Sequence, residues 1–274
     1  MNAGTVSQQR VASNPVTRVA LPGALMLLGA MSAITSAAEP LLTAEVQAKM
    51  VAEWERTIRE TTAAIDKDAK NVGLYSRRGD ALFFSARFAD AVADYDRMAE
   101  LDPATDASHW RRGIAFFYAR RYEDAAAQFE RYHSFDDVDR ENGIWRYLSQ
   151  VKAHGRDKAR QGLLKYAKDD REPFPAVYEL FASRTTPEAI LKSIADAKIS
   201  PADRQSREFY ANLYIGLNEF IEDRAQTALT HLELAARNPW WRTAGYGPHY
   251  MGQVARLHAE LLRKAASEAK PKTP

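Results

Sequence analysis

The chain has 274 residues, of which 46% are hydrophobic and 27% are charged, and it contains no cysteine. This composition can form a buried core, and it excludes collagen-like, low-complexity, disulfide-stapled, zinc-thiolate and cysteine-nucleophile proteins. The formal net charge of +2 falls to zero without Arg10 and Arg18, so no general positive field is left and we expect no nucleic-acid partner.

The first 38 residues have the pattern of a signal peptide. They carry two arginines and no acidic residue, and positions 19–38 have no charged side chain. The apolar stretch ends in small residues, with Ser36 and Ala38 at the −3 and −1 positions of a cleavage site. We therefore expect export to the periplasm or the extracellular space. The alternative is an uncleaved anchor that attaches the chain to a membrane, because twenty uncharged residues can span a bilayer.

Residues 39–70 are predicted to hold an amphipathic helix, from Thr43 to Ile65, and residues 71–139 contain two tandem repeats. A shift of 34 positions superimposes the segment from Tyr75 on the segment from His109. The identical pairs are Arg77/Arg111, Arg78/Arg112, Gly79/Gly113, Ala81/Ala115, Phe83/Phe117, Arg87/Arg121, Asp90/Asp124, Ala91/Ala125, Ala93/Ala127 and Arg97/Arg131. Thirty-four residues is the length of the tetratricopeptide repeat, in which each unit is a helical hairpin.

A third, weaker repeat is predicted within residues 201–268. Its Gly216, Ala228, Leu232 and Ala235 have the spacing of Gly79, Ala91, Tyr95 and Met98 in the first repeat. Small residues at these places allow two antiparallel helices to approach closely. Residues 140–200 are expected to form degenerate helical pairs, 246–264 a capping helix, and 269–274 a disordered tail. The predicted fold class is all-α, a tetratricopeptide-repeat-like helical solenoid.

From about position 75 to position 262, the order of elements resembles the new lipoprotein I family of periplasmic tetratricopeptide lipoproteins. The resemblance rests on three segments: Asn142–Gln150, Gly155–Arg160 and Phe209–Gly216. It implies a non-enzymatic and often dimeric adaptor that binds envelope proteins such as a hydrolase or a protease. The chain departs from that family because it lacks the lipid-attachment cysteine.

Few motifs in the sequence suggest chemistry. Ser149 and Lys152 match the Ser-x-x-Lys pattern of penicillin-recognising enzymes, but the companion motifs are missing, so a hydrolase is the alternative function. The run from Asp137 to Gly143 is similar to the start of a calcium loop, yet its glycine and final glutamate are misplaced, which favours a turn between repeats. His109 aligns with Tyr75 and is expected to lie in the core. We therefore predict no catalytic residue, metal or cofactor.

The repeats predict a concave surface lined by aromatic side chains. The tetratricopeptide pattern places six apolar residues on its inner face: Phe83, Phe84, Trp110, Ile114, Phe117 and Tyr118. Two interpretations remain open, since another helix of the chain, or a peptide or partner helix, could cover this face. We expect an interaction scaffold that binds a protein or peptide partner through these six residues. A small-ligand binder that uses the same groove is a further alternative.

A second aromatic cluster, from Pro239 to Tyr250, contains Trp240 and Trp241 in a segment rich in glycine and proline. The favoured interpretation is a loop whose tryptophans cover the end of the helical stack. The alternative is a platform for a saccharide or peptide.

Overall fold

The computed structural model describes residues 39–168 and 170–269, and this part of the chain is helical and contains no strand. The expectation of an all-α fold is confirmed. The predicted leader 1–38 and the residues 270–274 of the predicted tail lie outside the described residues. The helices are α1 (Ala44–Ile65), α2 (Val72–Phe84), α3 (Phe88–Leu101), α4 (Trp110–Tyr118), α5 (Tyr122–Phe135), α6 (Arg140–His154), α7 (Arg156–Gln161), α8 (Phe174–Phe181), α9 (Pro187–Asp196), α10 (Pro201–Ile221), α11 (Ala225–Arg237) and α12 (Tyr246–Ala269), with short 3-10 turns η1 (Pro103–Thr105) and η2 (Trp240–Arg242).

Several helices begin where a polar side chain can accept a hydrogen bond from the first turn. The hydroxyl of Thr43 accepts from the backbone of Val46 at the start of α1. Thr186 and Ser200 do the same for α9 and α10, and each is followed by a proline at the first helical position. Such caps satisfy backbone N–H groups that have no partner inside the helix.

Consecutive helices pack as pairs, and three of the pairs are held by the same close approach. A Cβ atom added at Gly79 would lie 2.6 Å from the ring of Tyr95, so only glycine fits where α2 meets α3. The equivalent distances are 2.6 Å from Gly113 to the ring of Phe129 and 2.7 Å from Gly216 to Leu232. Each glycine therefore precedes by 16 residues the large side chain that packs on it.

The two helices of four pairs are joined by the same type of turn. Ala86, Arg120, Ser183 and Asp223 all have φ between 58° and 61°, in the left-handed region. Each is followed by an arginine, and the backbone N–H of that arginine bonds to a carbonyl five residues earlier. The pair α8–α9, which the repeat spacing did not single out, thus turns in the same way as the other three.

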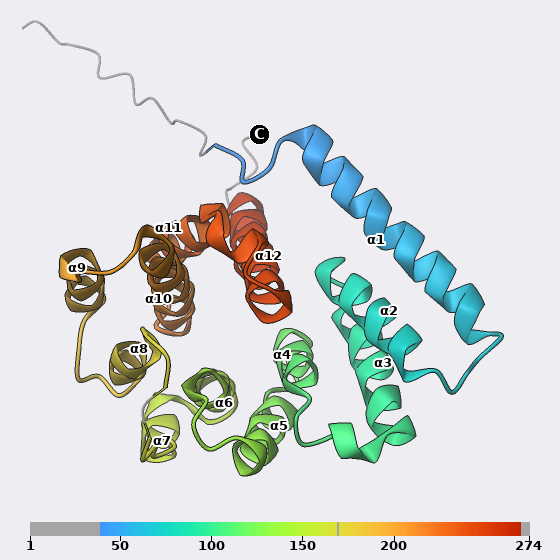
Figure 1. Ribbon diagram of the computed structural model, residues 1–274, viewed down its shortest axis with the longest axis horizontal. Helices are drawn as coiled ribbons and strands as arrows, with labels where there is room; N and C mark the ends of the chain where they lie inside the picture. Colours follow the sequence, from blue (N-terminus) through green and yellow to red (C-terminus); the bar gives the residue numbers. More distant parts are fainter. Residues whose placement is uncertain (1–38, 169, 270–274) are drawn as a thin grey trace, which may run out of the picture. The chain divides into compact units, whose positions relative to one another are not determined.

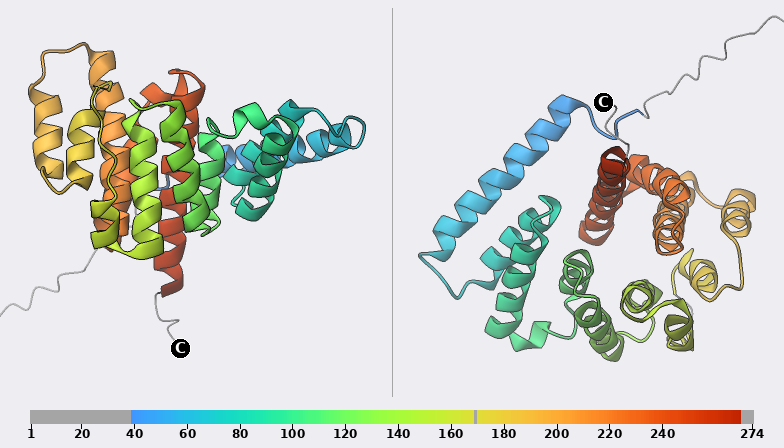
Figure 2. Two further views of the ribbon diagram at one scale, coloured as in Figure 1. Left: turned by 90° about the horizontal axis from the view of Figure 1, so that it is seen from below. Right: turned by 180° about the vertical axis from the view of Figure 1, so that it is seen from behind.

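Helix α12 packs against helices from both halves of the described chain. Figures 1 and 2 show it beside α11, which precedes it, and also facing α2 and α4. Its buried stripe includes Tyr250, Val254 and His258. None of the helices in residues 39–168 and 170–269 is both long enough and apolar enough to cross a bilayer.

Candidate functional site

The structure places the six predicted groove residues against the chain's own helices. Phe83, Phe84, Ile114 and Phe117 are buried, while Trp110 and Tyr118 are half-buried. Rings of α12 contact four of them, Phe83, Phe84, Trp110 and Tyr118, and Trp145 of α6 packs on Phe117. The face that the sequence left open to a partner or to another helix is therefore filled by the chain itself, and an extended peptide cannot lie along it in this structure.

A stripe along α12 makes these contacts. The Tyr246 hydroxyl donates to Asp80 of α2 at 2.6 Å, and one turn later Tyr250 stacks on Phe83 with ring centroids 5.6 Å apart. Further along, His258 lies 2.8 Å from the Tyr118 hydroxyl through Nδ1. Burial lowers the pKa of His258 to about 3, so its ring is neutral at this contact.

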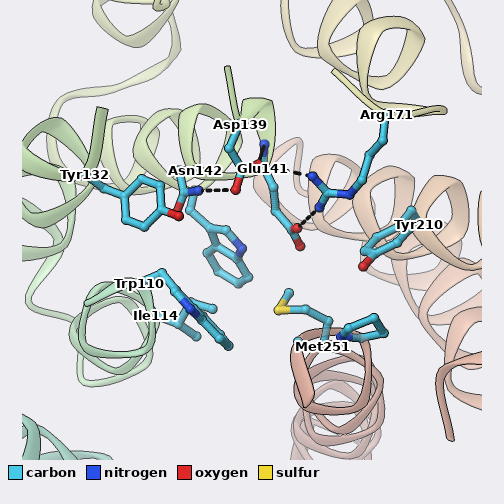
Figure 3. A pocket seen from close by; sticks show the side chains of 12 residues that line it. Trp110, Ile114, Tyr132, Asp139, Glu141, Asn142, Arg171, Tyr210 and Met251 are labelled. Atoms are coloured by element: carbon cyan, nitrogen blue, oxygen red, sulfur yellow. Dashed lines mark hydrogen bonds and ion pairs between the residues drawn. The ribbon is translucent and has the colours of Figure 1, made fainter. Parts of the chain in front are cut away.

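Next to the contacts of α12 with α2 and α4, a pocket of about 300 Å³ remains between α4, α6, α10 and α12. We call it the central pocket. Figure 3 shows Glu141, Tyr210 and Met251 pointing into it from three different helices. Its apolar wall consists of Trp110, Ile114, Trp145, Gly247, Pro248 and Met251, and its polar wall consists of Tyr132, Asp139, Glu141, Asn142, Arg171 and Tyr210. Four of the twelve are aromatic, and three are formally charged.

The start of α6 supplies the two carboxylates of the pocket. Asp139 caps this helix and accepts hydrogen bonds from the backbone of Glu141 and from the Asn142 amide, at 3.0 and 2.6 Å. Glu141 lies in the first turn and accepts a hydrogen bond from the Tyr214 hydroxyl of α10. An acidic residue is favoured in a first turn because the helix dipole is positive there.

Arg171 reaches the same carboxylates from the segment between α7 and α8. Its guanidinium donates to Glu141 at 2.6 Å and lies 3.6 Å from Asp139 and 3.3 Å from Asp170. Asp170 in turn accepts from the backbone N–H of Arg140 at 2.9 Å, which ties the segment to the start of α6. Three carboxylates therefore share one arginine.

Burial and crowding of negative charge shift the titration of these groups. Burial is the largest cause that raises the pKa of Glu141, to about 7, and Asp139 and Asp170 raise it further while Arg171 opposes them. The pKa of Asp139 is also raised, mainly by burial. The Glu141 side chain keeps 14% of its accessible surface, so the group is within reach of a ligand in the pocket. A carboxyl group that titrates near neutral pH is typical of functional sites.

The other predicted motifs have structural roles. Ser149 is fully buried and donates to the Trp145 carbonyl at 2.7 Å, so its hydroxyl cannot reach a substrate in this structure. His109 is buried and accepts from the Arg112 backbone, as expected for a core histidine. Trp241 is buried and donates to the Ala236 carbonyl at 3.2 Å, which agrees with a covering role.

The run similar to a calcium loop forms a turn instead. Asp136 accepts from the backbone of Val138 and Asp139, at 2.9 and 3.1 Å, and Asp139 caps α6. Within residues 39–168 and 170–269, no group of three or more acidic and histidine side chains is arranged to hold a metal ion.

Sequence reasoning missed the central pocket as a site. Its acids belong to the run that is similar to a calcium loop, and Arg171 lies in none of the motifs of the sequence. The signal that could have indicated the pocket is the pair Asp139 and Glu141 at the start of α6, because the same helix carries Trp145 on its buried face. Compared with known proteins, the chain matches no family model and no curated protein.

Proposed function

We propose that the chain is an exported, non-enzymatic binding protein of the cell envelope, built as a tetratricopeptide-type solenoid, whose binding site is the central pocket. The repeat assignment is supported by the three glycine contacts at Gly79, Gly113 and Gly216, which have the same register in each hairpin. Helical repeats of this kind serve as scaffolds because they present several helices to one surface.

One observation carries the binding proposal. The inner face is covered by helices of the chain except at a pocket of about 300 Å³, which combines aromatic walls with the ion pair between half-buried Glu141 and exposed Arg171. Pockets with an apolar lining and a few fixed polar groups are the usual form of a binding site. This volume fits a single side chain or a small molecule. We therefore expect a partner to insert one side chain here, and a small-ligand binder is the second candidate because the size also suits a free molecule.

The hydrolase alternative has no such support. A serine nucleophile needs an exposed hydroxyl beside a base. Ser149 is buried and bonded to a backbone carbonyl, and the Lys152 ammonium lies 4.4 Å from the centre of the Phe220 ring.

A variant that fills the pocket tests the proposal. A Cβ atom at Gly247 would have no neighbour within 4 Å, so Gly247→Phe adds a ring to the pocket wall without a clash at its base. Ala127→Phe adds the same ring at an exposed position of α5 and serves as the matched control.

Both variants and the parent are used to capture ligands from an envelope extract, with proteins and small molecules identified by mass spectrometry. We expect the parent and Ala127→Phe to retain the same ligand and Gly247→Phe to lose it, at an unchanged thermal midpoint. Equal capture by all three proteins contradicts the central pocket as the site.

A further inference from the structure

The charges around the central pocket do not balance. Asp139, Glu141 and Asp170 supply three carboxylates, and Arg171 is the one cationic side chain among the described residues that pairs with all three. The side chains that α4, α5, α10 and α12 contribute to the wall carry no formal charge. The pocket therefore has an excess of negative charge when its acids are ionised.

The neutral part of the wall is rich in aromatic rings. Trp110, Tyr132, Trp145 and Tyr210 come from four different helices and surround the same space. The face of an aromatic ring attracts a cation, and tryptophan does so most strongly. Negative charge and aromatic faces thus favour the same kind of ligand.

We propose that the central pocket binds an organic cation, the ammonium or guanidinium group at the end of an alkyl chain, as carried by a lysine or arginine side chain of a partner or by a free amine. This inference rests on the proposed function, in which the central pocket is the binding site. The cation is placed near Glu141 and Asp139, and the alkyl chain lies between Ile114 and Met251.

A buried polar donor also lies in this wall. Trp145 is 1% exposed, and its indole N–H has no acceptor in hydrogen-bond geometry among the described residues. Buried polar groups without a partner are rare and call for an explanation. The Tyr214 hydroxyl, which donates to Glu141, is the polar group that interacts with Trp145, so this tryptophan belongs to the same polar wall as Glu141.

Binding of a cation is coupled to the ionisation of Glu141. The titratable and charged groups that face this carboxyl are Arg171, Asp139, Asp170, Tyr210 and Tyr214. A cation binds most tightly when the Glu141 carboxyl has lost its proton and carries a negative charge. The pKa of this group is raised to about 7, so the ionised form becomes populated around neutral pH. Affinity should then rise with pH through neutrality, by about tenfold between pH 6 and pH 8.

The experiment titrates four probes into the full chain and follows tryptophan fluorescence and calorimetry. N-acetyl-lysine amide is the cationic probe, N-acetyl-norleucine amide is its neutral counterpart, N-acetyl-glutamate amide is the anionic control, and 1,5-diaminopentane represents a free amine. We expect the lysine probe to bind at least about tenfold more tightly than the norleucine probe at pH 8, since one charge-assisted contact gives about that factor.

Tighter binding of the lysine probe than of diaminopentane identifies a polypeptide side chain as the source, and the reverse order identifies a free amine. Both results support the cation. Glu141→Gln keeps one acceptor oxygen for Arg171, and its amide nitrogen can donate to the Tyr214 hydroxyl oxygen instead. It should weaken lysine-probe binding about tenfold and remove its pH dependence. Gly247→Phe should abolish binding of the probes, and Ala127→Phe should leave it unchanged.

Two results overturn the inference in different ways. If the lysine and norleucine probes bind equally and Gly247→Phe binds neither, the preference for a cation is refuted but the pocket remains the binding site. Failure of the parent to bind any cationic probe at millimolar concentration, together with unchanged ligand capture by Gly247→Phe, removes both the cation and the proposed function.

Discussion

Replacement of Glu141 by Gln should change how the stability of the protein depends on pH. The carboxyl has a pKa of about 7 in the folded chain against an ordinary value of 4.5. Between these values the folded state binds a proton that the unfolded state has lost, so the group stabilises the fold at low pH and this contribution is lost as pH rises through 7. A glutamine at this position has no such dependence.

The size of the effect follows from the shift. With about 1.4 kcal/mol per pKa unit, Glu141 should make unfolding about 2.5 kcal/mol more costly at pH 5 than at pH 8. His109 and His258 act in the opposite sense, because burial lowers the pKa of each from 6.5 to about 3. Their stabilisation is complete above pH 6.5, and each loses about 2 kcal/mol on going down to pH 5.

The two opposing effects partly cancel in the parent protein. We expect the parent to lose about 1.5 kcal/mol of unfolding free energy between pH 8 and pH 5 from these three groups, and Glu141→Gln to lose about 4 kcal/mol. Urea unfolding followed by circular dichroism at both pH values measures the difference, in which all other titrating groups cancel. Parallel pH dependences for the two proteins would refute the account of the Glu141 environment.

Four further substitutions test the packing and the turns of the helical pairs. Gly113→Ala should destabilise the fold by about 1 to 2 kcal/mol in urea unfolding, because the added methyl group meets the aromatic ring of the paired helix. Gly247→Ala adds a methyl group in open space and should stabilise the fold. Stabilisation by both substitutions would contradict the close approach at Gly113. Arg120→Gly should raise the unfolding free energy by about 0.5 to 1 kcal/mol by relieving a left-handed backbone, and a loss of stability there would argue against that turn. Tyr118→Phe should lower the free energy of unfolding by about 1 to 3 kcal/mol, since it leaves His258 without its buried hydrogen-bond partner. An unchanged midpoint of thermal unfolding would mean that α12 does not pack on α4.

Local features of the fold were predictable because they depend on short-range spacing. The caps at Thr186 and Ser200 can be read from the sequence, because a side-chain oxygen and a following proline act within one turn. The close contacts at Gly79, Gly113 and Gly216 could be expected from their common register with a large residue 16 positions later. These signals lie within one helical hairpin.

The packing position of α12 could not be predicted, because its contacts join distant parts of the chain. Tyr118 and His258 are 140 residues apart, and Asp80 and Tyr246 are 166 residues apart. A second apolar stripe on α4 indicates that this face is buried, but it carries no information about which helix buries it. The sequence therefore left open whether a partner or another helix of the chain covers the six groove residues.

The central pocket was missed for a related reason. Arg171 lies in a segment without helical periodicity, so no pattern indicated that it would meet Glu141 of α6. The turn at Ser183 and Arg184 is a signal that could have been used, because the same backbone turn is followed by arginine at Arg87, Arg121 and Arg224. It would have identified α8 and α9 as a fourth hairpin.

The most direct test of the central pocket as a binding site is amide hydrogen exchange, measured with and without saturating N-acetyl-lysine amide at pH 8. The account predicts slower exchange at residues 139–145 and 246–251, where α6 and α12 line the pocket. Unchanged exchange at both of these segments would contradict it.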